Sequence, residues 1–97
     1  MLYLVISAPH PDNTGGVSER QRDFWAWIDH LKTEGRVLNG WRRMGRGAVV
    51  VFDAPDHDVL HGLLQQWAHR IPATFEVQPL ISPPGAVEHP PATVSER

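Results

Sequence analysis

The clearest potential for chemistry lies in three consecutive residues, Trp41, Arg42 and Arg43. An arginine that faces a pocket can hold a carboxylate or an enolate oxygen through paired, charge-assisted hydrogen bonds. The run reads as part of a strand, in which neighbouring side chains point to opposite faces. We therefore expect Arg43 to share the face of Trp41 and Arg42 to point to the other face. A solvated strand end with a stacked tryptophan is the alternative interpretation.

Two further side chains have the chemistry for proton transfer, Asp23 and His61. Asp23 flanks the apolar face of a predicted helix, where a carboxylate would act as a general base if a pocket desolvated it. His61 lies at the edge of the apolar face of a second predicted helix. A surface charge and a hydrogen-bonded boundary residue are the respective alternatives. His57 and His61 have the i, i+4 spacing of some metal sites, but no third ligand is evident, so we predict neither a metal nor another cofactor.

The elements that must position these groups follow from turn formers and apolar spacing. Four strands are predicted, at residues 2–8, 37–44, 48–53 and 74–81. A helix is predicted over residues 18–34, with Gly35 at its end. A second helix begins after Asp56, a favourable N-cap, and ends before Pro72. Residues 45–47 supply the turn between the second and third strands.

This β-α-β-β-α-β order predicts an α+β fold, namely a ferredoxin-like four-stranded antiparallel sheet with two helices on one face. The domain is predicted to cover residues 1–81, and residues 82–97 are predicted to form a proline-rich C-terminal arm. The third strand is apolar on both faces, so the face opposite the helices also needs cover. A second copy of the same sheet would supply it. We therefore expect a homodimer or a larger homo-oligomer.

Composition narrows the classes of function. The formal net charge of −2 gives no reason to expect a nucleic-acid partner. The sequence has no cysteine, which excludes disulfides, thiolate catalysis and cysteine zinc sites. The N-terminus lacks the basic start and the long apolar core of a signal peptide, and no apolar run approaches membrane-spanning length. We expect a cytoplasmic protein that has a small-molecule substrate and no membrane partner.

A set of short segments, in order along the chain, resembles the muconolactone Δ-isomerase family. The segments are Met1-Leu2-Tyr3, Glu34-Gly35, Gly40-Trp41-Arg42 with Gly45, Val51-Phe52-Asp53-Ala54-Pro55, Leu60-His61 and Glu76-Val77. The resemblance implies a dimeric α+β barrel. It also implies cofactor-free proton transfer that moves a double bond in an unsaturated lactone bearing a carboxylate. The chain departs from the family pattern at Phe24, where the family carries a glutamate on the inward face of the first helix.

We therefore predict a cofactor-independent acid–base enzyme of isomerase or cyclase type, acting on a small unsaturated carbonyl, lactone or carboxylate compound of secondary metabolism. The predicted lining of its pocket is Phe24, Trp27 and Trp41. Asp23 or His61 would transfer the proton. Arg42 or Arg43 would stabilise negative charge. The alternatives are a non-catalytic dimeric domain that binds a metabolite or a partner protein, and a cofactor-free monooxygenase of the same barrel superfamily.

Overall fold

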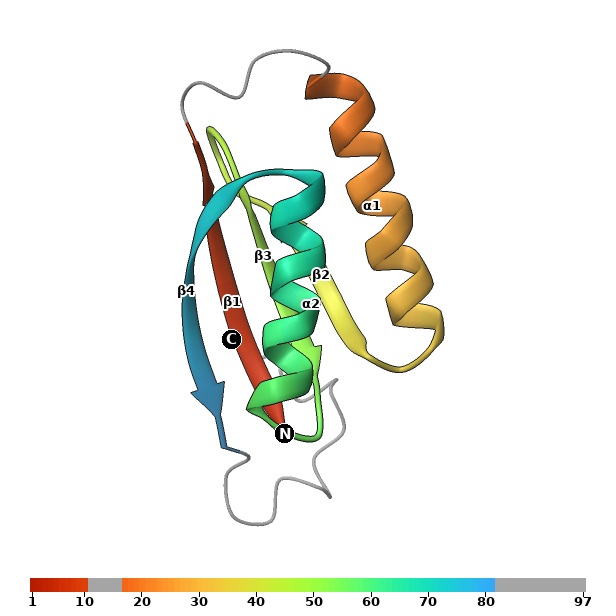
Figure 1. Cartoon of the computed structure of the whole chain (residues 1–97), viewed down its shortest axis with the longest axis vertical. Coiled ribbons are helices and arrows are strands. Elements are labelled where there is room, and N and C mark those ends of the chain that lie inside the picture. Colours follow the sequence, from red (N-terminus) through yellow and green to blue (C-terminus); the bar gives the residue numbers. More distant parts are fainter. Residues whose placement is uncertain (11–16, 82–97) are drawn as a thin grey trace, which may run out of the picture.

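A computed structural model of the chain has the predicted order of elements (Figure 1). It describes residues 1–10 and 17–81, and the predicted arm at 82–97 lies outside the described residues. The elements are β1 (Leu2–Pro9), α1 (Val17–Thr33), β2 (Val37–Arg42), β3 (Ala48–Asp53), α2 (His57–Arg70) and β4 (Ala73–Leu80). Their bounds differ from the predicted ones by two residues at most.

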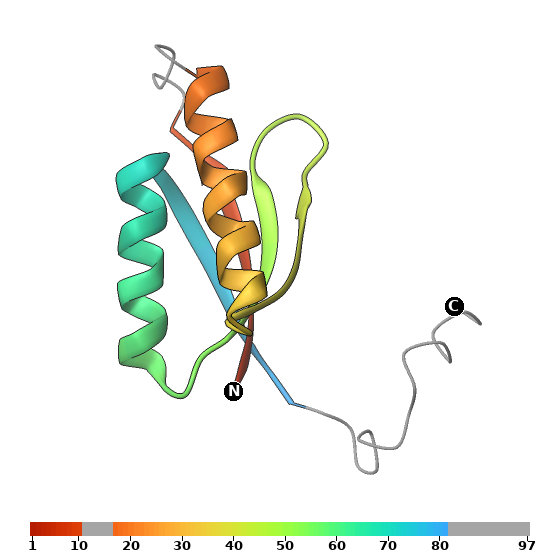
Figure 2. The ribbon, with the colours of Figure 1, turned by 90° about the vertical axis from the view of Figure 1, so that its right-hand side faces the viewer.

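The four strands form one antiparallel sheet in the order β2-β3-β1-β4, with β3 and β1 at its centre. Both helices pack on the same face of this sheet, as two perpendicular views show (Figure 1, Figure 2). The arrangement confirms the predicted α+β, ferredoxin-like fold. Self-association of two such sheets stays a prediction.

Local chemistry explains where the helices begin and end. Asp56 precedes α2 with extended backbone, and its side chain accepts a hydrogen bond of 2.9 Å from the backbone N–H of Val59, as expected of an N-cap. Gly35 follows α1 with a φ of 82°, in the left-handed region that favours glycine. The N–H of Arg36 donates to the carbonyl of Leu31 at 2.9 Å, which closes the helix end. Neither described helix is long and apolar enough to cross a membrane.

The helix-covered face of the sheet carries the core. The central strands contribute Tyr3, Val5, Val50 and Phe52, each at most 1% exposed. The two helices contribute Phe24, Trp27, Ile28, Leu31, Leu60, Leu63 and Trp67. Removal of this apolar surface from water is the main favourable term in folding.

The second strand is shorter than predicted, because residues 43–47 form the turn into β3. Gly45 and Gly47 have φ angles of 89° and 105° in this turn, a conformation that side chains rarely adopt. Gly47 also lies against β1, where a side chain would clash with the carbonyl oxygen of Ser7. The turn is thereby held close to the end of β1.

The opposite face of the sheet, which we call the open face, carries an apolar stripe. Leu4 is paired with Val51 and Ile6 with Val49 across the two central strands. On β2, Trp41 is paired with Val49 and is 52% exposed. The four aliphatic residues are only partly buried, and neither described helix lies on this side of the sheet (Figure 2).

Candidate functional site

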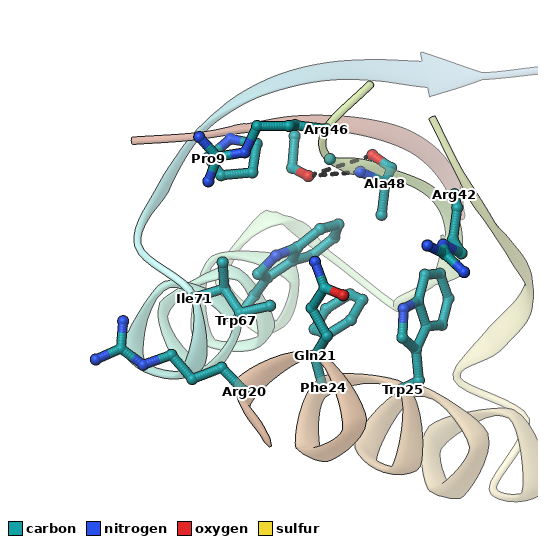
Figure 3. Close-up of a pocket in the computed structure, with 12 residues that line it drawn as sticks. Pro9, Arg20, Gln21, Phe24, Trp25, Arg42, Arg46, Ala48, Trp67 and Ile71 are labelled. Atoms are coloured by element: carbon teal, nitrogen blue, oxygen red, sulfur yellow. Dashed lines mark hydrogen bonds between the residues drawn. The ribbon is translucent and has the colours of Figure 1, made fainter. Parts of the chain in front are cut away.

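A cavity lies between α1 and the sheet, beside the turn that joins β2 to β3 (Figure 3). Its lining comes from the end of β1, the first half of α1, the β2–β3 hairpin and the end of α2. Its volume is about 60 Å³. On this measure one water molecule needs about 10–15 Å³, so the enclosed part admits a small polar group, and the ring of a larger ligand would extend toward the mouth beside Trp25.

Three aromatic side chains form the apolar wall of the cavity: Phe24 and Trp25 from α1, and Trp67 from α2. The centroid of the Phe24 ring lies 4.7 Å from that of Trp67 and 5.0 Å from that of Trp25. Phe24 and Trp67 are almost fully buried, whereas Trp25 is only partly buried. Rings packed in this way hold one another in place, so the wall has a defined shape before a ligand binds.

Arginines supply positive charge around the cavity. Arg42 lines it from the end of β2, Arg46 from the turn and Arg20 from α1 (Figure 3). Within residues 1–10 and 17–81, no carboxylate forms an ion pair with Arg42 or Arg46. Nor does any described carboxylate line the cavity. The site therefore favours an anion, because these guanidinium groups can donate charge-assisted hydrogen bonds to an anionic oxygen.

A buried serine organises the end of the cavity nearest the turn. Ser7 is 2% exposed, and its Oγ accepts a hydrogen bond of 2.9 Å from the N–H of Ala48 (Figure 3). The carbonyl of Ser7 accepts a hydrogen bond of 2.8 Å from Nη1 of Arg43. The N–H of Arg43 in turn donates to the carbonyl of Gly47 at 3.0 Å. These bonds tie the turn that carries Arg46 to β1.

Two of the predicted site residues line this cavity. Phe24 forms part of its wall, and Arg42 contributes a guanidinium group. Strand alternation separates the two neighbouring arginines: Arg42 is paired with Ala48 on the helix side of the sheet, while Arg43 bonds to β1. The cavity therefore brings Phe24 and Arg42 together and leaves Arg43 in a supporting position.

The two other predicted aromatic walls lie elsewhere. Trp41 belongs to the open face, because the pleat of the strand reverses between it and Arg42. Trp27 packs toward α2, where the guanidinium carbon of Arg70 lies 4.7 Å from its ring centroid. Trp25, which is not among the predicted site residues, lines the cavity in their place.

The two predicted proton acceptors stand outside the cavity lining. The side chain of Asp23 is 66% exposed, and its Oδ2 lies 3.3 Å from Nε of Arg70, an ion pair that joins α1 to α2. His61 is exposed on α2. His57 lies with its Nδ1 3.0 Å from the hydroxyl of Tyr3. In the described part of the chain, no three histidine or carboxylate side chains gather so as to hold a metal ion. Proton transfer by Asp23 or His61 stays a prediction.

Several lining residues lie beyond the predicted set, and most have a signal in the sequence. Gln21 precedes Phe24 and Trp25 by three and four residues, a spacing that places all three on neighbouring parts of one helix surface. Ser7 follows the buried alternation of its strand, which is a signal for an inward-facing hydroxyl. Arg46 lies between two turn glycines, so a short hairpin brings it to the same cavity as Arg42.

The sequence matches the model of one protein family. That family is described as Domain of unknown function (DUF3303), and the match covers residues 1–92. No curated protein matches the chain.

Two of the solved structures that share the fold of this chain are enzymes of known reaction. The crystal structure of muconolactone isomerase at 3.3 Å resolution has a TM-score of 0.69 and 24% sequence identity, over 93% of this chain and 98% of that chain. The 5-chloro-2-hydroxyhydroquinone dehydrochlorinase from Burkholderia phenoliruptrix AC1100, in complex with 2,5-dihydroxybenzoquinone, has a TM-score of 0.62 and 17% identity, over 88% and 98%. Similarity at these identities is a similarity of fold, and it confirms the fold-level resemblance to muconolactone isomerase.

Proposed function

This chain belongs to the protein family described as Domain of unknown function (DUF3303), and we propose that it is a cofactor-independent enzyme of isomerase type that binds a small organic anion between α1 and the sheet. One observation carries the proposal. The cavity combines an aromatic wall with two arginines, Arg42 and Arg46, that no described carboxylate neutralises. An isomerase and a dehydrochlorinase that share the fold lend support to chemistry on small unsaturated compounds.

Arg42 is the proposed anion-binding residue. It lies on the helix side of β2 and lines the cavity together with Trp25. When a proton leaves a carbon next to a carbonyl group, negative charge develops on the carbonyl oxygen. A guanidinium already held at that oxygen stabilises the transition state more than the ground state, which accelerates the step. Arg46, on the turn that Arg43 ties to Ser7, adds a second positive charge at the same cavity.

The cavity also limits the class of substrate. A volume of about 60 Å³ admits a carboxylate or a carbonyl group, and the aromatic wall suits an apolar ring that extends from that group toward the mouth of the cavity. The arginines suit a carboxylate or an enolate oxygen. We therefore propose a monocyclic unsaturated carbonyl or carboxylate compound, a class that includes lactones. In the proposed isomerisation a C–H bond breaks, its electron pair shifts the double bond, and the proton returns at another carbon, so no oxidant or reductant is consumed.

For the proton transfer itself, we propose Asp23 first. It directly precedes Phe24 on α1, but its carboxylate lies outside the cavity lining and pairs with Arg70 at 3.3 Å, so this role requires the ion pair to open and the side chain to turn toward the substrate. The Asp23 side chain is 66% exposed and that of Arg70 is 29% exposed, so opening this pair costs on the order of 1 kcal/mol. His61 on α2 is the second proposed proton acceptor.

A non-catalytic domain that binds the same kind of anion is the second candidate function. One observation favours it: among the described lining residues there are arginines and a glutamine but no carboxylate and no imidazole. Such a lining can hold an anion without moving a proton. The two candidates therefore share the binding step and differ in turnover.

Calorimetric titration with 2,5-dihydroxybenzoquinone, an acidic compound of single-ring size, tests the shared binding step. Arg42→Gln should weaken binding about tenfold or more, because a hydrogen bond to a charged group contributes about 1.5–3 kcal/mol. Arg36→Gln is the matched control, since Arg36 pairs with Glu34 at 3.7 Å and does not line the cavity. Equal weakening by both substitutions, or by neither, would contradict the proposed site.

Turnover separates the enzyme from the binding domain. Muconolactone incubated with the full chain in D₂O should exchange its acidic C–H for deuterium and acquire a shifted double bond, which NMR detects. Asp23→Asn or His61→Gln should abolish exchange and leave binding intact, according to which residue accepts the proton. Binding of muconolactone without faster exchange would contradict the isomerase proposal and support the binding domain.

We further propose that two copies pair through the open face. Its apolar residues are Leu4, Ile6, Val49, Val51 and Trp41. Leu2 and Leu80, which are paired with each other, extend the apolar surface at one end of the face. The middle of β4 is polar, because Gln78 is paired with Leu4 and donates to Glu76 at 2.8 Å. An apolar centre with a partly polar border suits a symmetric contact between two identical faces. Sedimentation velocity should show a dimer or a larger oligomer, and a monomer at high protein concentration would contradict the proposal.

A further inference from the structure

We infer that Trp25 determines which anions the cavity accepts: its indole is a braced wall that favours planar, conjugated rings over saturated rings of the same charge and similar size. The inference rests on the proposed function, because it concerns the same anion-binding cavity. It goes further by assigning the ligand class, a planar conjugated monocyclic anion, and the residue that selects it.

Trp25 lies where the enclosed cavity meets the surface of the molecule. It lines the cavity and also two shallower hollows along α1 and the β2 edge. Arg42 lines the same three spaces. In Figure 3 the guanidinium group of Arg42 lies close to the ring of Trp25 at one side of the cavity. A ligand whose anionic group reaches Arg42 therefore has its ring next to the indole.

Two neighbours hold the indole in position. Gly40 is paired with Val50 on the helix side of β2, and a Cβ at Gly40 would lie 3.2 Å from Cζ3 of Trp25. The glycine thus leaves the space that the indole occupies. From α1, the ring of Phe24 meets the indole edge-to-face, at a centroid distance of 5.0 Å and an interplanar angle of 75°. A wall supported from two sides keeps one shape, so it can discriminate between ligands by their shape.

Flat and saturated rings differ in how closely they approach such a wall. All atoms of a planar conjugated ring can reach van der Waals contact with the indole at once. The axial hydrogens of a saturated ring keep most of its carbons farther away. Aromatic contacts exceed plain apolar burial by an amount that corresponds to about two- to tenfold in Kd. We therefore expect a preference of that size for the planar anion.

Benzoate and cyclohexanecarboxylate form the matched pair of probes, because they share one carboxylate and a six-membered ring. Titration calorimetry of the full chain should give a Kd for benzoate about two- to tenfold below that for cyclohexanecarboxylate. Trp25→Leu should bring the ratio of the Kd for cyclohexanecarboxylate to the Kd for benzoate close to one. Trp25→Phe should keep part of it, because a smaller aromatic ring remains.

Gly40→Ala tests the support of the wall with Trp25 unchanged. The added methyl group presses on the indole, so the ratio of the two Kd values should fall. Gly62→Ala is the control, since a Cβ there meets nothing within 4 Å, and it should leave the ratio unchanged. Circular dichroism of each variant establishes that it is folded. If Trp25→Leu does not fold, Trp25→Phe and Gly40→Ala still test the role of the indole.

The outcomes distinguish this inference from the function on which it rests. Equal binding of the two probes by the unchanged chain, or an undiminished ratio in the Trp25 variants, would overturn the role of Trp25. If Arg42→Gln still weakens the binding of both probes in that case, the proposed anion-binding cavity is supported. If neither probe binds, or Arg42→Gln has no effect on either, the proposed function itself fails.

Discussion

The two faces of the sheet are made of similar residues and have different surroundings. On β3, Val50 is completely buried under the helices, whereas its neighbours Val49 and Val51 on the open face are only partly buried. The pleat of the strand sends successive side chains to opposite faces, so position alone assigns each valine its environment. Apolar character by itself therefore does not identify the core of this domain.

The tryptophans show the same contrast with larger side chains. Trp67 is 1% exposed and sits within the helix-covered core, while Trp41 is 52% exposed on the open face. Trp25 lies between these extremes, at the border of the cavity. The three tryptophans thus differ in role: Trp67 stabilises the core, Trp41 belongs to the proposed interface and Trp25 to the proposed ligand wall. Their positions in the fold decide which role each one has.

The largest expected effect comes from placing a charge on each face in turn. Val50→Asp should prevent folding, because an unpaired carboxylate in the core costs several kcal/mol out of a total stability of about 5–15 kcal/mol. Val51→Asp should remain folded but lose self-association, since its side chain lies on the proposed interface. Thermal melting followed by circular dichroism, with sedimentation velocity, measures both effects. Identical behaviour of the two variants would remove the distinction between the faces.

The two tryptophans give the next largest difference. Trp67→Ala should lower the free energy of unfolding by about 3–5 kcal/mol, because it leaves a cavity among the core rings. Trp41→Ala should change the free energy of a single chain by about 0.5 kcal/mol or less. If Trp41→Ala lowers the free energy of unfolding by more than this, the loss should grow with protein concentration, as expected of a residue in a contact between two chains. Urea denaturation at two protein concentrations measures this, and equal losses at both sites would be inconsistent with the structure.

Two hydroxyl groups provide a smaller, matched comparison between covered and exposed positions. Ser7→Ala should cost about 1–3 kcal/mol, because the buried N–H of Ala48 loses its acceptor. The exposed hydroxyl of Thr33 donates to the carbonyl of Asp29 at 3.0 Å. Because water can replace this bond, Thr33→Ala should lower the free energy of unfolding by about 0.5 kcal/mol or less. Chemical denaturation of both variants measures the difference. A cost at Ser7 as small as that at Thr33 would mean that water replaces the lost bond.

The smallest expected effect concerns the link between the two helices that cover one face. Asp23→Asn removes the ion pair with Arg70 and should lower stability by less than about 1 kcal/mol, because the Asp23 side chain is 66% exposed. Glu34→Gln, which weakens exposed contacts with His30 at 3.0 Å and with Arg36 at 3.7 Å, is the control and should have an effect of similar size. A loss of several kcal/mol at Asp23 alone would show that this pair holds the helix layer together.

Most of the fold follows from local patterns. Asp56 is recognisable as an N-cap and Gly35 as a helix end because each satisfies backbone groups within a few residues of itself. The end of β2 is less well predicted. Residues 43 and 44 continue the strand pattern, and the structure shows that the chain has already turned there, through the hydrogen bond from Arg43 to Gly47 and the close approach of Gly47 to Ser7.

The candidate site is predicted less completely than the fold. Alternation along a strand predicts that Arg42 and Arg43 diverge, since that depends only on backbone geometry. It does not predict which of the two meets a cavity, because that depends on the side of the sheet that the helices cover. For the same reason Trp41 is predicted as a wall, although it lies on the open face. Trp27 is predicted as a wall but packs toward α2, and the structure places Trp25 at the cavity.

Sequence alone therefore determines the order of strands and helices, the amphipathic faces and the absence of cysteine chemistry, because propensity, capping and alternation act over a few residues. Tertiary structure decides which of two apolar faces becomes the core, and it brings Arg42 of β2, Trp25 of α1 and Ser7 of β1 to one cavity. These three residues are separated along the chain by 17 or more positions, and only the packing of α1 on the sheet brings them together.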